Sequence, residues 1–130
     1  LEKALPDVEL ISVQLPHYLG PSACLHLMST VSIVAEDLAV VYRPLTSVFF
    51  LQELERKGFQ VVDVPEEEFG TMAPNVLALE PRVCVMLEGN PVTKQRLEAV
   101  GCSVFTYKGK HISLLAEGGP TCLTRPILRG

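Results

Sequence analysis

Cys122 has the surroundings in this 130-residue sequence that most strongly suggest chemistry. It ends the segment Gly118-Gly119-Pro120-Thr121-Cys122. Two glycines ahead of a cysteine allow backbone conformations closed to other residues, and they let a ligand come close to the main chain. We therefore expect an accessible cysteine, presented from a loop at the entrance to a strand. A glycine-rich hairpin with an incidental cysteine fits the same spacing.

His26 is the candidate partner for this cysteine. It stands at the entrance to an apolar strand, in the segment Cys24-Leu25-His26-Leu27-Met28-Ser29. A lone histidine beside apolar residues is commonly a hydrogen-bonded core residue. A cysteine nucleophile, however, needs a base or cation to hold its thiolate and a proton donor for the leaving group, and histidine does both near neutral pH. The pattern predicts Cys122 and His26 as a catalytic pair.

Three other groups invite a functional interpretation. Glu66-Glu67-Glu68 is expected to be a solvated first helical turn rather than a metal site. Cys24, His26 and Cys122 lack an evident fourth zinc ligand, so no metal is expected. Arg125 could anchor a substrate carboxylate, but strand alternation would place it on the face opposite Cys122. The substrate-binding residues are therefore left unassigned.

Two ββαβ units are expected to position these residues, and together they predict an α/β fold. The first unit has strands near residues 29–35, 38–42 and 59–64, with a helix near 47–57 that Gly58 ends. About 43 residues later the same order returns. This second unit has strands near 75–79, 82–87 and 102–107, and its helix begins at Asn90 and Pro91 and ends at Gly101.

A third, partial repeat is expected at residues 111–130. Its two strands would be His111 to Leu115 and Cys122 to Leu128, and the sequence stops before a helix. The full set of repeats is thus about 29–65, 75–108 and 111–130 within one domain that spans 1–130. Such an incomplete array leaves strand edges or apolar faces in need of cover.

The overall composition narrows the class of protein. With 15 acidic and 11 basic residues and no run of Lys or Arg, nucleic acid is not an expected partner. No apolar run reaches the roughly 20 residues that span a bilayer. The four cysteines form no C-x-x-C pair, and Cys84 and Cys102 lie in apolar runs where a thiol acts as a small hydrophobe. We expect a cytoplasmic protein with no disulfide framework.

The motifs resemble a known enzyme group. GGPTC at 118–122, HLMS at 26–29 and the repeated ββαβ units are similar to the guanidino-group modifying superfamily, which includes arginine deiminase, dimethylarginine dimethylaminohydrolase and the amidinotransferases. The resemblance implies a pentein-type α/β propeller with five ββαβ blades around a central active site. Residues 1–130 would be its C-terminal part, about two and a half blades. Cys122 would be the nucleophile and His26 the catalytic histidine.

The resemblance also implies a reaction. The Cys122 thiolate would attack the central carbon of a guanidinium group, and His26 would protonate the leaving amine. Water would then release a ureido product from the covalent thiouronium, as in a hydrolase of arginine or an N-methylated arginine. Capture by another amine would make an amidinotransferase instead. Neither route requires a cofactor.

Some features of the family pattern are missing. The acidic residues that hold the guanidinium group lie mostly in the N-terminal blades, and the chain starts at Leu1 without a methionine. We therefore expect a missing N-terminal half or a partner chain that completes the propeller, and an inactive isolated fragment. A homo-oligomer is a separate alternative. Arginine deiminases carry an aspartate where this sequence has Met28, which is closer to the dimethylargininase pattern. A non-catalytic binding propeller, like the ribosome anti-association factors, is the alternative.

Overall fold

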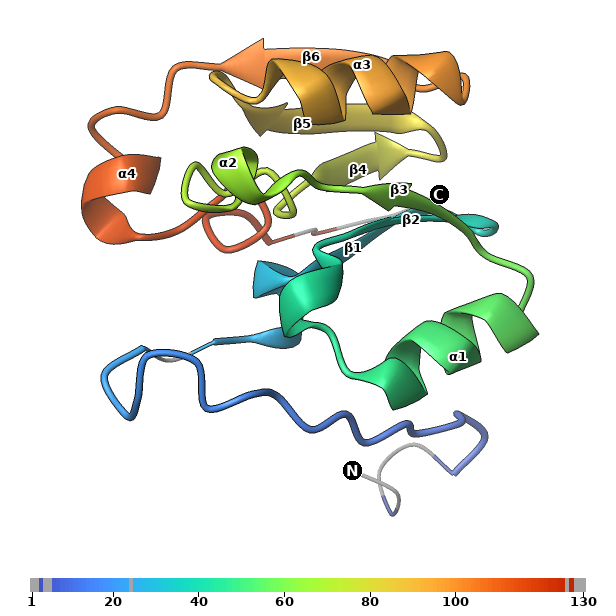
Figure 1. Cartoon of the computed structure of the whole chain (residues 1–130). Coiled ribbons are helices and arrows are strands. Elements are labelled where there is room, and N and C mark those ends of the chain that lie inside the picture. Colours follow the sequence, from blue (N-terminus) through green and yellow to red (C-terminus); the bar gives the residue numbers. More distant parts are fainter. Residues whose placement is uncertain (1–2, 4–5, 24, 126, 128–130) are drawn as a thin grey trace.

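A computed structural model of the chain describes residue 3 and residues 6–23, 25–125 and 127 (Figure 1). The first unit contains β1 (Val31–Ala35), β2 (Leu38–Val41), α1 (Val48–Arg56) and β3 (Gln60–Asp63). Two short 3-10 turns, η1 (Leu27–Ser29) and η2 (Arg43–Leu45), precede β1 and α1. The predicted order of strand, strand, helix and strand is confirmed in this unit.

The second unit repeats this order. After the short helix α2 (Glu66–Phe69) come β4 (Leu77–Glu80), β5 (Val83–Leu87), α3 (Pro91–Ala99) and β6 (Ser103–Tyr107), and a short helix α4 (Ser113–Ala116) follows. The helices α1 and α3 begin about 43 positions apart, as do β3 and β6. The internal repeat inferred from the sequence is therefore present in the structure.

Local signals explain where the two long helices begin and end. The side chain of Ser47 caps α1 by accepting a hydrogen bond from Phe50 N at 3.3 Å. Gly58 and Gly101, just beyond the two helices, adopt the positive φ angles that glycine tolerates best. Pro91 occupies the first turn of α3, as predicted. These signals place each helix as the crossover between two parallel strands.

Each unit contributes one three-stranded sheet. The strand orders are β1-β2-β3 and β4-β5-β6, and in each sheet the first pair is antiparallel and the second parallel. Parallel neighbours require a crossover connection, which α1 and α3 provide. The two sheets are therefore copies of one topology.

The core lies on both faces of the first sheet. On one face Leu54 of α1 packs with Val31, Ala39 and Val41. On the other face, Val40 and Val62 share a larger cluster with residues of the second unit, including Met86 and Leu97. The helix α3 contacts both β3 and β6, so it lies between the two sheets. Burial on both faces explains the uninterrupted apolar run in β2.

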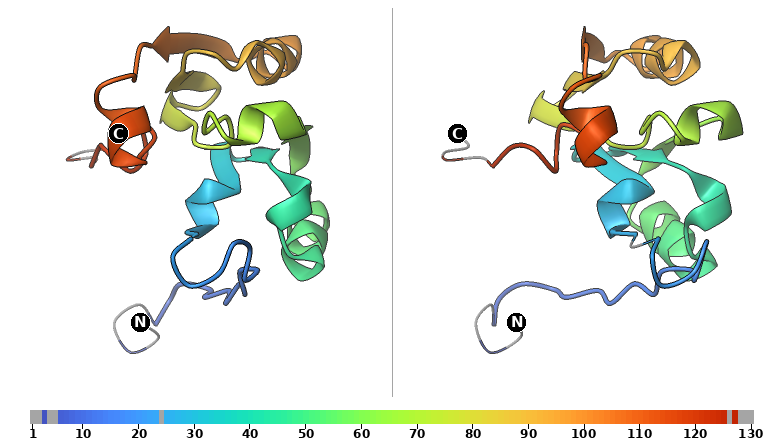
Figure 2. Two further views of the ribbon diagram at one scale, coloured as in Figure 1. Left: turned by 60° about the vertical axis from the view of Figure 1, so that its left-hand side comes forward. Right: turned by 90° about the vertical axis from the view of Figure 1, so that its left-hand side faces the viewer.

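The units are joined where β1 lies beside β4. Arg82 N donates to the carbonyl of Val34 at 2.9 Å, and the Arg82 guanidinium pairs with Asp37 at 2.7 Å. Figure 2 shows the first unit, with α1, on one side of this junction and the second unit, with α3, on the other. This junction sets how the residues before β1 and before β4 face each other.

The outer face of the second sheet is apolar and uncovered in the described part of the chain. Leu79 and Phe105 are 57% and 59% exposed, and Val83 and Val85 beside them are only half-buried. On the first sheet the corresponding face is covered by the helix of the next unit. The exposed Val48 and Phe49 of α1 form a second uncovered apolar surface at the other end.

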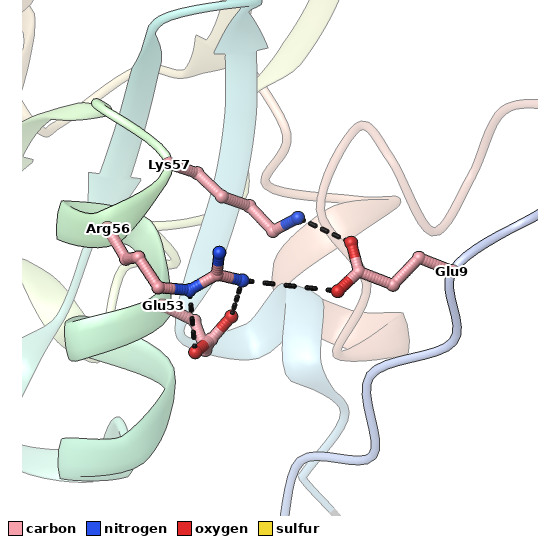
Figure 3. A network of polar contacts seen from close by, with 4 residues as sticks. All are labelled: Glu9, Glu53, Arg56 and Lys57. Atoms are coloured by element: carbon pink, nitrogen blue, oxygen red, sulfur yellow. Dashed lines mark hydrogen bonds and ion pairs between the residues drawn. The ribbon is translucent and has the colours of Figure 1, made fainter.

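The N-terminal segment runs in extended form beside α1 (Figure 1). Its contact with this helix is ionic. Glu9 pairs with Lys57 Nζ at 2.6 Å and lies 4.0 Å from the guanidinium of Arg56, which also binds Glu53 (Figure 3). Because these side chains are exposed to water, ion pairs of this kind contribute little to stability. None of the described helices is long and apolar enough to cross a membrane.

The predicted strands of the third, partial repeat are wrong within the described residues. Residues 113–116 form α4, and Tyr107 Oη lies 2.7 Å from Ser113 Oγ. Cys122 N and Leu123 N both bond to the carbonyl of Gly119 at 3.1 Å, instead of to a neighbouring strand. Local turns have therefore satisfied the backbone groups that a strand would use. Residues 126 and 128 of the second predicted strand lie outside the described residues.

The expectation for residues 66–68 is wrong for Glu68. This side chain is 4% exposed, and its carboxylate accepts hydrogen bonds from Val92 N, Thr93 N and Thr93 Oγ1 at 2.6 to 2.9 Å. It therefore caps the N-terminus of α3, where the helix dipole favours negative charge. The side chain of Asn90, at the N-cap position, makes no capping bond and instead donates to the carbonyls of Thr71 and Leu87.

Candidate active site

Cys122 lies in a tight turn after α4, and its side chain is exposed. The preceding residues Gly118, Gly119 and Pro120 are buried. The accessible loop predicted from the sequence is therefore present, although no strand follows it in the described residues. The turn therefore exposes one thiol, while the backbone segment that leads to it is buried.

Asn75 fixes this turn from beneath. Its side chain is 4% exposed. The amide oxygen accepts hydrogen bonds from Thr121 N at 3.0 Å and from Thr121 Oγ1 at 2.8 Å, and the amide nitrogen donates to Cys122 Sγ at 3.2 Å. One buried side chain thus holds both the backbone before the cysteine and its sulfur.

Gly119 makes this close approach possible. A Cβ atom at position 119 would overlap the side chain of Asn75. A Cβ at Gly118 would instead make ordinary contacts with Cys122 and Leu123. The second glycine of the motif is therefore needed for space beside the amide, which is a more specific role than backbone freedom.

Sequence reasoning missed Asn75. An asparagine directly after Pro74 is typical of a turn, and it lies 47 positions before Cys122. Its function depends on a contact between the second unit and the segment after it. A local pattern carries no signal for such a contact.

Ser32 of β1 holds the segment that carries Asn75. Its hydroxyl donates to the carbonyl of Pro74 at 2.7 Å and accepts from Val76 N at 3.1 Å. Both bonds are buried, and they flank Asn75 on either side. The first unit thereby positions the asparagine that contacts the cysteine.

His26 lies just before η1, and its side chain is exposed. The HLMS motif forms a 3-10 turn, in which Ser29 N donates to the His26 carbonyl at 2.8 Å and His26 N donates to Ser29 Oγ at 3.1 Å. Thr30 then leads into β1. The histidine is thus held at the end of the same strand that carries Ser32. Cys24 lies outside the described residues.

The segments that carry His26 and Cys122 border one cavity of about 450 Å³. Leu27 and Met28, which follow His26, form part of its lining together with Thr121, which precedes Cys122. Neither His26 nor Cys122 lines the cavity itself, although both are described. The structure brings the two segments to a common cavity, and the catalytic pair stays a prediction.

The cavity lining contains no charged side chain among the described residues. Its other members are Val31, Ser32, Ile33, Phe50, Val76, Leu77, Ala78 and Thr124. The polar groups that it offers are three hydroxyls. A guanidinium ion would therefore find no carboxylate partner on these walls.

The other two described cysteines are not candidates for the nucleophile. Cys84 and Cys102 are buried, as the sequence predicted for small apolar residues. Burial raises the pKa of the Cys84 thiol to about 12, with a smaller contribution from Cys102, and it also raises the pKa of Cys102. A thiol is nucleophilic as its thiolate, so neither side chain is reactive at neutral pH.

Comparison with known proteins shows which family the chain belongs to. Residues 34–129 match the family described as arginine deiminase. The chain belongs to the arginine deiminase family. The matched range includes Asn75 and Cys122 but begins after His26. The prediction that His26 is catalytic therefore depends on the HLMS motif alone.

Relatives of known sequence agree with this membership. The uncharacterized protein YkgA of Bacillus subtilis is 28% identical over 130 residues, which cover 100% of this chain and 43% of YkgA. The arginine deiminase of Rhodococcus erythropolis is 44% identical over 72 residues, which cover 55% of this chain and 17% of the enzyme. The chain therefore spans less than half the length of these relatives.

Solved structures share the fold. An amidinotransferase of saxitoxin biosynthesis from Microseira wollei superimposes with a TM-score of 0.77 at 17% identity, over 98% of this chain and 39% of that protein. The N-terminal domain of a cyanobacterial arginine dihydrolase gives 0.75 at 20% identity, over 98% of this chain and 47% of that domain. Dimethylarginine dimethylaminohydrolase of Pseudomonas aeruginosa gives 0.59 at 20% identity, over 78% and 36%.

The predicted superfamily and fold class are both confirmed. The arginine deiminase match and these neighbours identify the guanidino-group modifying superfamily. The two ββαβ units share the fold of these pentein-type neighbours, which is consistent with part of an α/β propeller.

Proposed function

We propose that this chain is the cysteine-bearing part of an enzyme that modifies guanidino groups, and that Cys122 is its nucleophile. The main support for this proposal is the match of residues 34–129 to the arginine deiminase family, because the matched range includes Cys122 and the side chain of Cys122 is exposed. The contact with Asn75 supports it, because a buried amide directed at an exposed sulfur fixes the position of that sulfur. His26 is proposed as the acid and base.

The proposed reaction has two steps. The Cys122 thiolate adds to the central carbon of the guanidinium ion, and the C–N bond to ammonia or an alkylamine breaks as His26 gives that nitrogen a proton. His26 then takes a proton from water, which attacks the thiouronium carbon and breaks the C–S bond. The products are a urea and the free thiol. Atoms and charges balance without a cofactor.

Arginine or an N-methylated arginine is the proposed substrate. Arginine fits the family match, whereas Met28, on the cavity wall, replaces the aspartate of the deiminase pattern. An apolar side chain there is a better neighbour than a carboxylate for a methyl group on the guanidinium nitrogen. The fold shared with the saxitoxin-pathway amidinotransferase supports the amidinotransferase route as the second proposal. A non-catalytic propeller remains the alternative if Cys122 proves dispensable.

Further ββαβ units are proposed to complete the site. The helix α3 covers one face of the first sheet, and the equivalent face of the second sheet leaves Leu79 and Phe105 exposed. A unit of a longer chain, or of a partner chain, would place its helix there and bring the missing carboxylates. We therefore propose that residues 1–130 alone do not turn over a guanidine.

The decisive experiment replaces Cys122 in the longer protein that contains this chain. Citrulline release from arginine and from N-methylated arginines is measured for the parent protein, for Cys122→Ser and for the control Ser103→Ala, whose side chain is exposed on β6. Loss of turnover in Cys122→Ser alone supports the proposal. Equal turnover of every guanidino substrate in all three proteins contradicts it and favours the binding propeller.

The same assay on residues 1–130 tests the need for further units. The expected result is no citrulline above the background of the Cys122→Ser fragment. Turnover equal to that of the longer protein would show that the fragment holds all the groups it needs.

A further inference from the structure

We propose that Asn75 is a positioning residue that holds the Cys122 sulfur and favours its thiolate form. The catalytic meaning of this inference rests on the proposed function, but the contact itself does not. The amide lies beneath the cysteine turn and contacts it through both of its polar atoms. Among the described side chains, only Asn75 bonds to both Thr121 N and Cys122 Sγ, and Thr121 Oγ1 lies 3.9 Å from the same sulfur.

The orientation of the amide follows from its partners. Thr121 N is a backbone N–H and can only donate, so the atom of Asn75 that faces it must be the oxygen. The NH₂ group is thereby directed at Cys122 Sγ, at 3.2 Å. A thiolate is a much better acceptor of this bond than a neutral thiol. Hydrogen bonding to the charged form favours that form.

The amide is also fixed before any substrate arrives. Asn75 is 4% exposed, and the two bonds from Ser32 hold the backbone on both sides of it. Gly119 leaves just the space that its side chain occupies. A fixed dipole does not have to reorient when the thiolate forms, which is the property that makes such donors effective in catalysis.

A purely structural role for Asn75 makes a different prediction. If the side chain only anchors the turn through Thr121, loss of the NH₂ donor should leave the pH at which the sulfur ionises unchanged. Two variants together separate the two roles, because Asn75→Ala removes the donor without adding charge. Asn75→Asp is the second variant. It keeps an oxygen acceptor for Thr121 N, removes the donor to the sulfur and adds a negative charge beside it.

The test is the pH dependence of Cys122 alkylation by iodoacetamide in the intact protein. Peptide mass spectrometry assigns the label to Cys122 and excludes the other cysteines. The variants are Asn75→Asp, Asn75→Ala and the control Ser103→Ala, whose side chain is exposed on β6; Thr121 is left unchanged, because its hydroxyl lies 3.9 Å from Cys122 Sγ. Circular dichroism checks that each variant is folded.

In Asn75→Asp the midpoint of alkylation is expected to move up by about one pH unit, which lowers the neutral-pH rate on the order of tenfold. Asn75→Ala should move it in the same direction, and Ser103→Ala should leave it in place. An unchanged midpoint in folded Asn75→Ala overturns the inference, because that variant removes the donor and adds no charge. An unchanged midpoint in folded Asn75→Asp overturns it as well.

Failure of this inference can be told apart from failure of the proposed function. Alkylation needs no turnover, so a shifted midpoint stands even if Cys122→Ser leaves activity intact. Conversely, an unchanged midpoint together with an inactive Cys122→Ser enzyme would leave Cys122 as the nucleophile and remove Asn75 from its positioning role.

Discussion

The hydroxyl of Ser32 donates to the carbonyl of Pro74 at 2.7 Å, from the first strand of one unit to the loop before the first strand of the next. The same hydroxyl accepts from Val76 N. One side chain therefore fixes the segment that carries Asn75, and through Asn75 the turn that carries Cys122. Ser32 lies on β1, and this strand comes directly after His26 and η1 in the sequence.

Replacement of Ser32 by alanine should destabilise the fold. The change leaves the buried Val76 N without its partner, and an unsatisfied buried donor costs about 1–3 kcal/mol. Urea unfolding of Ser32→Ala measures this cost. Ser103→Ala is the matched control, because its exposed side chain predicts a change within about 0.5 kcal/mol. Equal stability of the two variants would contradict the bridging role.

Glu68 gives a second stability prediction. Glu68→Ala removes the acceptor of three hydrogen bonds at the start of α3, and loss of a helix cap costs about 0.5–2 kcal/mol. We expect a loss of about 2 kcal/mol in the free energy of unfolding. The neighbouring Glu67 is exposed, so Glu67→Ala should be nearly neutral. A neutral Glu68→Ala would mean that water replaces the cap.

Local and periodic signals predicted most of the regular structure. The helix caps, the glycines beyond the helices and the alternation of apolar runs located both ββαβ units, because each of these signals acts within a few residues. The prediction of strands after residue 110 was wrong for a different reason. An apolar run such as Ile112 to Leu115 fits a strand or a helix equally well, and the described residues that follow it form no second strand with which to make a hairpin.

The site was predicted only where a motif lies within one segment. GGPTC and HLMS could be found because their residues are adjacent in sequence. Asn75 and Glu68 could not be found in this way. Asn75 contacts a residue 47 positions away in the sequence, and Glu68 contacts one 24 positions away. Glu68 in particular lies in a run of three glutamates, and nothing in the run distinguishes the buried side chain from the exposed ones.

The two glycines of the cysteine motif should respond differently to alanine. In Gly119→Ala the new Cβ would overlap the Asn75 side chain, and overpacking of this kind costs typically about 1–3 kcal/mol. It should also slow alkylation of Cys122, because the amide must move. Gly118→Ala places its Cβ at 3.4 Å from Cys122 Cβ, an ordinary contact, and should be tolerated. Urea unfolding and alkylation rates measure both effects; equal behaviour of the two variants would argue against the packing described for Gly119.

The last prediction concerns stability at alkaline pH. Burial raises the pKa of the Cys84 thiol from 9.0 to about 12. Above pH 9 the unfolded chain loses this proton while the folded chain retains it, so unfolding releases a proton and the free energy of unfolding falls as the pH rises toward 12. Below pH 9 both states keep the proton, and Cys84 adds no pH dependence.

Cys84→Ala tests this linkage. The substitution creates a small cavity that lowers stability at every pH, so the comparison must use the slope of the free energy of unfolding against pH. We expect parallel curves for the two proteins below pH 9 and a shallower fall in Cys84→Ala above it. Denaturant unfolding under reducing conditions at a series of pH values provides both curves. Parallel curves throughout the alkaline range would show that the unfolded and folded states hold the thiol proton equally, and that Cys84 is less shielded from water than its burial indicates.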